Sequence, residues 1–226
     1  MSIKLVVFDM AGTTVSDENY VAQSFQQAME KHGYNVKLED VNPLMGYEKP
    51  LAIQMMLDKY ETDVLKINEE IIHQIHTEFV NIMIDFYTHS QEIKPLPNVE
   101  NTFEELRAMG IKIGLDTGFS KNIADLIISR LQWEDKIDIM VASDEVKNGR
   151  PYPDMINQIK TRLNIQPEDL IVKVGDTEVD INEGINAGCK YVVGVTTGAF
   201  TRSELEPFHP THIIDNISEL IAIIKS

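Results

Sequence analysis

Short apolar runs recur along the chain, and most of the stretches between them have the residue spacing of amphipathic helices. The runs, which are rich in β-branched residues, are Ile3–Phe8, Ile111–Leu115, Ile137–Val141, Leu170–Val174, Tyr191–Val195 and, more weakly, His212–Ile214. The helical patterns are Val99–Met109, Ile123–Leu131, Met155–Leu163, Asp180–Ala187 and Ile217–Ile224. Runs of this length predict buried strands. Because strands that alternate with helices form parallel sheets covered on both faces, the sequence predicts an α/β fold with a Rossmann-like core.

Residues 17–90 interrupt this alternation, because their apolar spacing predicts helices throughout. We expect helices near Tyr20–His32, Pro50–Tyr60 and Asn68–Tyr87. The last has a long apolar stripe formed by Ile71, Ile72, Ile75, Phe79, Ile82, Met83 and Phe86. We therefore predict an α/β core domain from residues 1–16 and 91–226, and an inserted all-helical cap domain from residues 17–90. Connections near residues 15–19 and 89–97 would let the cap close over the core.

Composition limits the classes of partner. The 226 residues, 43% of them hydrophobic, suffice for a buried core. The net charge of −16 argues against binding nucleic acid or anionic membranes, because no basic surplus faces their phosphates. The N-terminus has the pattern of neither a signal peptide nor a membrane span. We expect a cytoplasmic protein, either a monomer or a homodimer, that acts on a small molecule.

Polar residues follow four of the predicted strands. They are Asp9 after the first strand, Thr117 and Gly118 after the second, Arg150 in the segment after the third, and Asp176 and Asp180 after the fourth. Helix capping and turns explain any one of these placements. All four together are better explained by a shared site, because ligands of open parallel sheets bind beyond the carboxyl ends of the strands.

Carboxylates that gather without basic neighbours repel one another, and a hard divalent cation relieves that repulsion. Oxygen ligands together with a phosphate suit Mg²⁺. We expect Asp9 and Asp176 to bind Mg²⁺ directly, with Asp180 as a third ligand or a neighbour and the Ala11 carbonyl as a further oxygen.

The remaining groups suit a phosphorylated substrate. Thr117 and Arg150 would hold the phosphoryl oxygens as negative charge builds on them. The second oxygen of Asp9 would then attack phosphorus and form an aspartyl-phosphate intermediate. Ala11, Thr13 and Gly118 flank these groups and are predicted to contact the substrate.

Four segments carry a resemblance to the haloacid dehalogenase superfamily, and in this order they match its four motifs. They are Asp9–Thr14, Thr117–Gly118, Gly149–Pro153 and Gly175–Asp180. The resemblance covers the whole chain, including a helical cap after the first strand. It implies that Asp9 is the nucleophile, that Thr117 and Arg150 bind phosphate, and that Asp176 binds Mg²⁺.

Ala11 departs from most phosphatases of this superfamily. They carry a second Asp at this position, which protonates the leaving alkoxide and then activates water. Losing such an acid costs on the order of 10²–10⁴-fold in rate. Either the leaving group needs no proton, or another group supplies it.

The phosphonoacetaldehyde hydrolase branch resembles this chain at the same positions. It shares the alanine, the Gly-Arg-Pro-x-Pro form of the third motif and a Met-Gly-x-x-Lys cap segment, here Met45–Lys49. In that branch the lysine condenses with the substrate aldehyde, and the protonated imine accepts electrons as the C–P bond breaks. The resemblance implies that Lys49 forms an imine and that Met45 packs beside the aldehyde.

Two other interpretations of Lys49 are open. It could bind a remote anionic group in a phosphomonoesterase that resembles phosphoglycolate or sugar-phosphate phosphatases, or it could be a solvated residue at a helix start. Three positions depart from the branch: Ala52 replaces a histidine, Phe119 a tyrosine and Asn19 a cysteine. Phe119 is still expected to contact the substrate. The three changes suggest that this substrate differs from that of the branch.

Two rivals come from other classes. A metal-independent dehalogenase also lacks the second Asp, but the retained Asp176 and Asp180 argue against it because buried carboxylates without a cation are costly. A catalytically silent binding protein would not need the intact set of Asp9, Thr117 and Arg150.

Overall fold

The computed structural model describes residues 2–166 and 170–226, and its centre is a six-stranded parallel sheet. The strands are β1 (Ile3–Phe8), β2 (Lys112–Thr117), β3 (Ile139–Ala142), β4 (Leu170–Gly175), β5 (Tyr191–Val195) and β6 (His212–Ile214). Their order is β3-β2-β1-β4-β5-β6, and every neighbouring pair is parallel. The predicted α/β class is confirmed.

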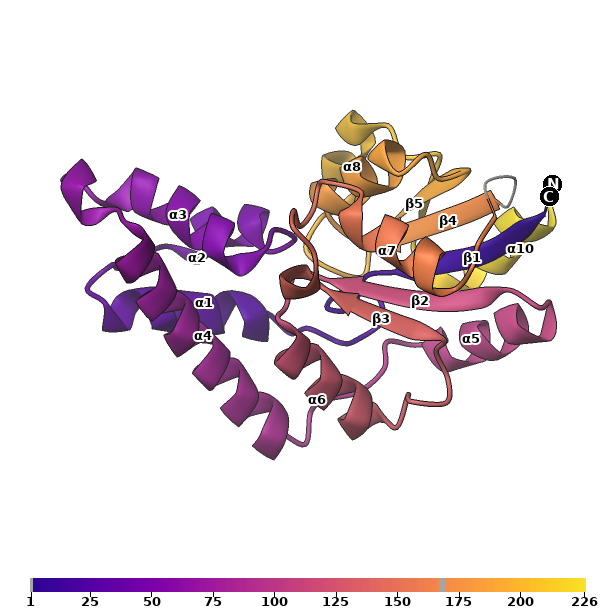
Figure 1. Cartoon of the computed structure of the whole chain (residues 1–226), viewed down its shortest axis with the longest axis horizontal. Coiled ribbons are helices and arrows are strands. Elements are labelled where there is room, and N and C mark those ends of the chain that lie inside the picture. The colour runs from indigo at the N-terminus through magenta and orange to yellow at the C-terminus, as the bar shows by residue number, and fades with distance from the viewer. Residues whose placement is uncertain (1, 167–169) are drawn as a thin grey trace.

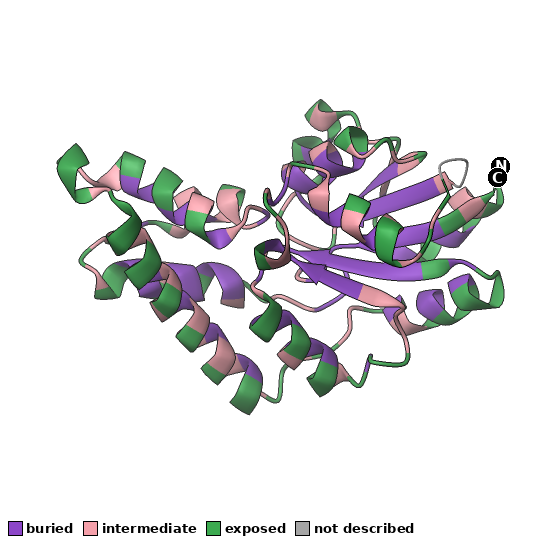
Figure 2. Cartoon of the chain, in the orientation of Figure 1, coloured by how far each residue is buried: buried purple, intermediate pink, exposed green. Residues whose placement is uncertain are grey.

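Helices cover both faces of the sheet (Figure 1). One face carries α5 (Val99–Ala108), α6 (Lys121–Leu131) and α10 (Leu220–Lys225); the other carries α7 (Asp154–Arg162), α8 (Glu178–Asn186) and α9 (Arg202–Leu205). Strand β1 shows why both faces are needed. Val6 and Phe8 pack in the cluster that includes α5 and α6, whereas Leu5 and Val7 pack with α7. The strands are accordingly buried along most of their length (Figure 2).

The segment between β1 and α5 is helical, as predicted. It contains α1 (Tyr20–Lys31), α2 (Leu38–Val41), α3 (Lys49–Tyr60) and α4 (Glu69–His89), with 3₁₀ turns at Asn42–Leu44 and Val64–Lys66. Further 3₁₀ turns lie at Ser143–Glu145, Glu206–Phe208 and Ile217–Glu219. Helices α1 to α4 lie beyond the carboxyl ends of the strands (Figure 1). We call residues 17–90 the helical insertion; its boundaries as a separate domain stay a prediction.

The two connections to the helical insertion run side by side. Ser16 N donates to Lys94 O at 3.0 Å, and Leu96 N donates to Thr14 O at 2.9 Å. The insertion is therefore attached through a short paired segment at one point. Among the described residues, no helix is long and apolar enough to cross a membrane.

Candidate active site

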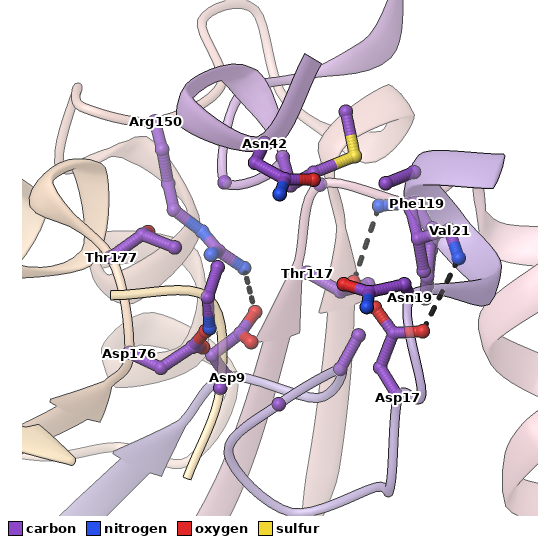
Figure 3. A pocket seen from close by; sticks show the side chains of 18 of the residues that line it. Asp9, Asp17, Asn19, Val21, Asn42, Thr117, Phe119, Arg150, Asp176 and Thr177 are labelled. Atoms are coloured by element: carbon purple, nitrogen blue, oxygen red, sulfur yellow. Dashed lines mark hydrogen bonds and ion pairs between the residues drawn. The ribbon is translucent and has the colours of Figure 1, made fainter. Parts of the chain in front are cut away.

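A cavity lies between the carboxyl ends of the strands and the helical insertion (Figure 3). Most of the predicted site residues line it: Asp9, Ala11, Met45, Lys49, Thr117, Gly118, Phe119, Arg150 and Asp176. Thr13 and Asp180 lie behind this lining and contact it through hydrogen bonds. The topology thus brings residues from four strand ends and from the insertion to one place.

Asp9 is positioned by the end of β1. Its backbone N–H donates to Val174 O at 3.0 Å and so extends the pairing with β4. The chain then turns sharply at Gly12, whose φ of 83° is a left-handed conformation that favours glycine. The Thr14 hydroxyl donates to the Asp9 carbonyl at 2.8 Å. These contacts fix the backbone that presents the carboxylate to the cavity.

Arg150 joins the first and fourth strand ends. Its guanidinium donates from Nη2 to Asp9 Oδ1 and from Nη1 to Asp180 Oδ1, each at 2.6 Å. Asp116 Oδ1 lies 3.3 Å from Nη2. Because the side chain is buried, these charge-assisted contacts hold the guanidinium in one orientation beside Asp9.

Lys173, within β4, lies behind Arg150 and was not expected from the sequence. It is fully buried and ion-paired with Asp116, with Glu183 at 2.9 Å and with Asp180 at 3.2 Å. Although burial opposes the charged form, the Asp116 and Glu183 carboxylates raise the pKa of Lys173. A lone lysine inside an otherwise apolar strand run was the one available indication, since such a residue needs buried anions nearby.

The acidic groups of the site shift one another's ionisation. Burial raises the pKa of Asp9 to about 6, against the opposing charge of Arg150. Burial and the charge of Asp9 raise the pKa of Asp176 well above its usual value. Burial also acts on Asp180, but Arg150 and Lys173 outweigh it and lower the pKa of that carboxyl. Carboxylates therefore exceed the cations at this end of the cavity.

This acidic end fits a hard divalent cation. Carboxylate oxygens of Asp9, Asp116 and Asp180 lie within 4.8 Å of one another. Asp116 Oδ2 is buried without a hydrogen-bond partner among the described residues. Asp116 is therefore a candidate ligand that the sequence did not indicate. Asp176 is held by the Thr13 hydroxyl at 2.9 Å and the Ala199 N–H at 2.7 Å, one to each carboxylate oxygen.

Thr117 ends β2, and its hydroxyl oxygen accepts a hydrogen bond from Phe119 N at 3.2 Å. This contact leaves the hydroxyl hydrogen available to a ligand in the cavity. The Phe119 ring lines the cavity and packs edge-on against Tyr87, with ring centroids 6.2 Å apart. Of the other positions that depart from the phosphonoacetaldehyde hydrolase pattern, Asn19 lines the cavity and Ala52 is buried in the insertion's core.

Lys49 is only 2% exposed, which contradicts the interpretation of a solvated lysine. Its Nζ donates to Met45 O at 2.9 Å and to Tyr47 O at 3.0 Å. The rings of Phe119 and Phe79 lie 5.8 and 6.0 Å from Nζ. The amine is thus held in an aromatic environment that lines the same cavity as Asp9.

That environment weakens the charged form of Lys49. Burial lowers its pKa to about 8, and the Arg150 charge adds to this effect, whereas Asp9 and Asp17 oppose it. A larger fraction of the amine is therefore neutral near physiological pH than in an exposed lysine.

The segment that carries Lys49 docks directly on the core. A Cβ on Gly46 would lie 2.3 Å from Thr177 Oγ1 and 2.4 Å from Val179 Cγ2, so only glycine permits this approach. Tyr47 Oη donates to Glu178 Oε1 at 3.0 Å. These contacts hold the segment that carries Lys49 against the core.

The haloacid dehalogenase-like hydrolase family matches residues 6–194. The chain belongs to this family. It is 30% identical over 231 residues to a phosphonoacetaldehyde hydrolase from Bacillus mycoides, covering 96% of this chain and 86% of that one. It is 32% identical over 220 residues to a bifunctional phosphonoacetaldehyde hydrolase/aminoethylphosphonate transaminase from Clostridioides difficile, covering 90% of this chain and 34% of that one.

Solved structures share the fold of this chain. A phosphonoacetaldehyde hydrolase-like protein from Oleispira antarctica has a TM-score of 0.84 at 24% identity, covering 100% of this chain and 92% of that one. The structure of a predicted phosphoglycolate phosphatase from Haemophilus somnus has a TM-score of 0.80 at 21% identity, covering 98% and 97%. The chain is therefore a hydrolase of this superfamily, and its resemblance to the phosphonatase branch is confirmed.

Proposed function

We propose that this hydrolase cleaves the C–P bond of a small carbonyl-bearing phosphonate, with Asp9 as nucleophile, Lys49 as imine-forming amine and Mg²⁺ as cofactor. The observation that supports this most strongly is that one cavity holds Asp9 and a buried lysine whose pKa is lowered to about 8. Ala11 offers no acid for an alkoxide leaving group, so the lysine provides the missing assistance in another form.

Asp9 is prepared for attack by its contacts. Oδ1 is bound to Arg150, whereas Oδ2 has no hydrogen-bond partner within residues 2–166 and 170–226. We assign the attack on phosphorus to Oδ2, which gives an aspartyl-phosphate. Thr117 and Arg150 would hold the phosphoryl oxygens as charge develops on them.

Asp9, Asp176, Asp180 and the Ala11 carbonyl would hold Mg²⁺. Asp116 is a further candidate, because a carboxylate oxygen of this residue lies within 4.8 Å of those of Asp9 and Asp180. When bound, the ion supplies positive charge that lets the carboxylate nucleophile and the anionic substrate approach each other. The excess of carboxylates at this end of the cavity supports that assignment.

Lys49 would act on the carbon side of the substrate. Its neutral amine adds to the carbonyl to give a carbinolamine, which takes up a proton on its hydroxyl and loses water to give a protonated imine. As Asp9 attacks phosphorus, the C–P electron pair moves toward the imine nitrogen and forms an enamine. The leaving carbon therefore needs no proton from position 11. The enamine carbon then takes up a proton and the imine forms again. Hydrolysis of the imine and of the aspartyl-phosphate frees Lys49 and Asp9.

A phosphomonoesterase that uses Lys49 to bind a remote anion is the alternative. The lysine donates two hydrogens to backbone carbonyls, which leaves a third for an anionic group. Similarity to the structure of a predicted phosphoglycolate phosphatase also favours this alternative.

Phosphate release from phosphonoacetaldehyde and from small phosphate monoesters, with and without Mg²⁺, separates the two functions. The Lys49→Arg variant is the matched control, because it keeps a cation but cannot form an imine. Loss of phosphonate cleavage in this variant supports the imine. Retention of phosphonate cleavage in Lys49→Arg, or turnover confined to phosphate esters, would favour the phosphomonoesterase.

A further inference from the structure

Three carboxyl groups among the described residues line the cavity, and the proposed function already uses two of them. They belong to Asp9, Asp17 and Asp176. Asp9 is bound to Arg150, and both oxygens of Asp176 accept hydrogen bonds from neighbouring protein groups. Of these three described carboxyl groups, Asp17 is the one without a role in the proposed function.

Asp17 sits where the connection from β1 enters the helical insertion. Its Oδ1 accepts a hydrogen bond from Val21 N at 3.2 Å, which Figure 3 draws as a dashed line. Within the described part of the chain, Oδ2 has no hydrogen-bond partner. One oxygen therefore anchors the carboxyl to the first turn of α1, and the other is available to a ligand.

Asp17 and Lys49 influence each other across the cavity. Burial raises the pKa of Asp17, and the hydrogen bond from Val21 N and, to a smaller extent, the Lys49 charge oppose that rise. The Lys49 pKa is lowered by burial and supported by only two carboxylates, Asp9 and Asp17. The two groups thus shift toward each other in proton affinity, which favours proton exchange between them through the substrate oxygen or a water.

We propose that Asp17 is the acid–base residue for imine formation at Lys49. This inference rests on the proposed phosphonate-cleaving function. The Asp17 carboxylate takes a proton from the Lys49 ammonium, and the neutral amine adds to the substrate carbonyl. The carboxyl then returns that proton to the carbinolamine hydroxyl, which leaves as water. The products of the step are the protonated imine, one water and the original Asp17 carboxylate.

Asp17→Asn tests this role, because asparagine retains an oxygen for Val21 N but cannot carry the proton. The assay mixes enzyme with phosphonoacetaldehyde and cyanoborohydride and follows the reduced adduct on the Lys49 peptide by mass spectrometry. We expect adduct formation to slow on the order of 10²-fold, with the substrate KM little changed. Formate should partly restore the rate of Asp17→Ala, which a merely structural role would not allow.

Glu18→Gln is the matched control, since Glu18 is the next residue, is exposed and pairs with Lys94 at 3.5 Å. It should form the adduct at the wild-type rate. Equal rates for Asp17→Asn and wild type would overturn the role of Asp17 and leave the imine intact, as would an equal loss in Glu18→Gln. A wild-type enzyme that releases phosphate but yields no adduct would instead overturn the imine itself, and Asp17 with it.

Discussion

The buried amine of Lys49 has a characteristic pH dependence. At its lowered pKa of about 8, roughly 10% of the amine is neutral at pH 7. An ordinary lysine with a pKa of 10.5 would be only about 0.03% neutral, so burial raises the reactive fraction roughly 300-fold. Because only the neutral amine adds to a carbonyl, we expect the rate of imine formation to rise about tenfold per pH unit below pH 8 and to level off above it.

The measurement is the rate of cyanoborohydride trapping between pH 6 and pH 10 under single-turnover conditions, with the adduct located by peptide mapping. Lys49→Met should give no adduct, which controls for reaction at exposed lysines. A rate that keeps rising through pH 10 would show an ordinary lysine pKa. An adduct on other peptides would show that Lys49 is not the reacting amine. Either result would refute this explanation of Lys49.

Three further outcomes follow from the contacts of the site. Gly46→Ala should lower kcat/KM by about 10²-fold without unfolding the core. The added Cβ would lie 2.3 Å from Thr177 Oγ1 and would displace the segment that carries Lys49. Steady-state kinetics measure the loss of activity, and thermal melting shows whether the core stays folded. Lys173→Met should cost about 3–5 kcal/mol in urea unfolding, since it leaves Asp116 and Glu183 buried without their cation, and Lys173→Arg should cost less. A chelator should abolish phosphate release, and added Mg²⁺ should restore it; activity indifferent to the chelator would favour a metal-independent reaction.

The sheet could be predicted because each strand is a short apolar run, and the helices between the strands have clear periodicity. Strands β1, β5 and β6 have the predicted bounds, whereas those of β2, β3 and β4 differ by one or two residues, as at β2, which extends to Thr117. The short helices α2 and α9 were not predicted, since four residues are too few to show a helical period. The hydrogen-bonded pairing of the two connections at Ser16 and Leu96 depends on tertiary contacts that no local pattern reports.

The candidate site, too, could be predicted only in part from the sequence. Asp9, Thr117 and Asp176 could be placed together because parallel strands end at one edge of a sheet. Lys173 could not be assigned to the site from the sequence, because its ion-pair partners come from β2 and α8 and meet it only in the folded chain.

The groups contributed by the insertion were harder to place. The burial of Lys49 was not evident either, since a lysine before proline at a helix start is usually solvated, and only the docking of Gly46 on the core encloses it. Asp17 drew no notice because a single acidic residue before a helix is typical of an ordinary N-terminus.

The site of phosphoryl attachment decides whether Asp9 attacks phosphorus. Enzyme quenched in acid during turnover of phosphonoacetaldehyde can be digested and its phosphopeptides mapped by mass spectrometry. We predict a phosphoryl group on the peptide that contains Asp9, and none in Asp9→Asn, which should keep its fold and lose turnover. Phosphate release by Asp9→Asn at a near-normal rate, or a phosphoryl group on a different residue, would contradict the assignment of Asp9 as the nucleophile.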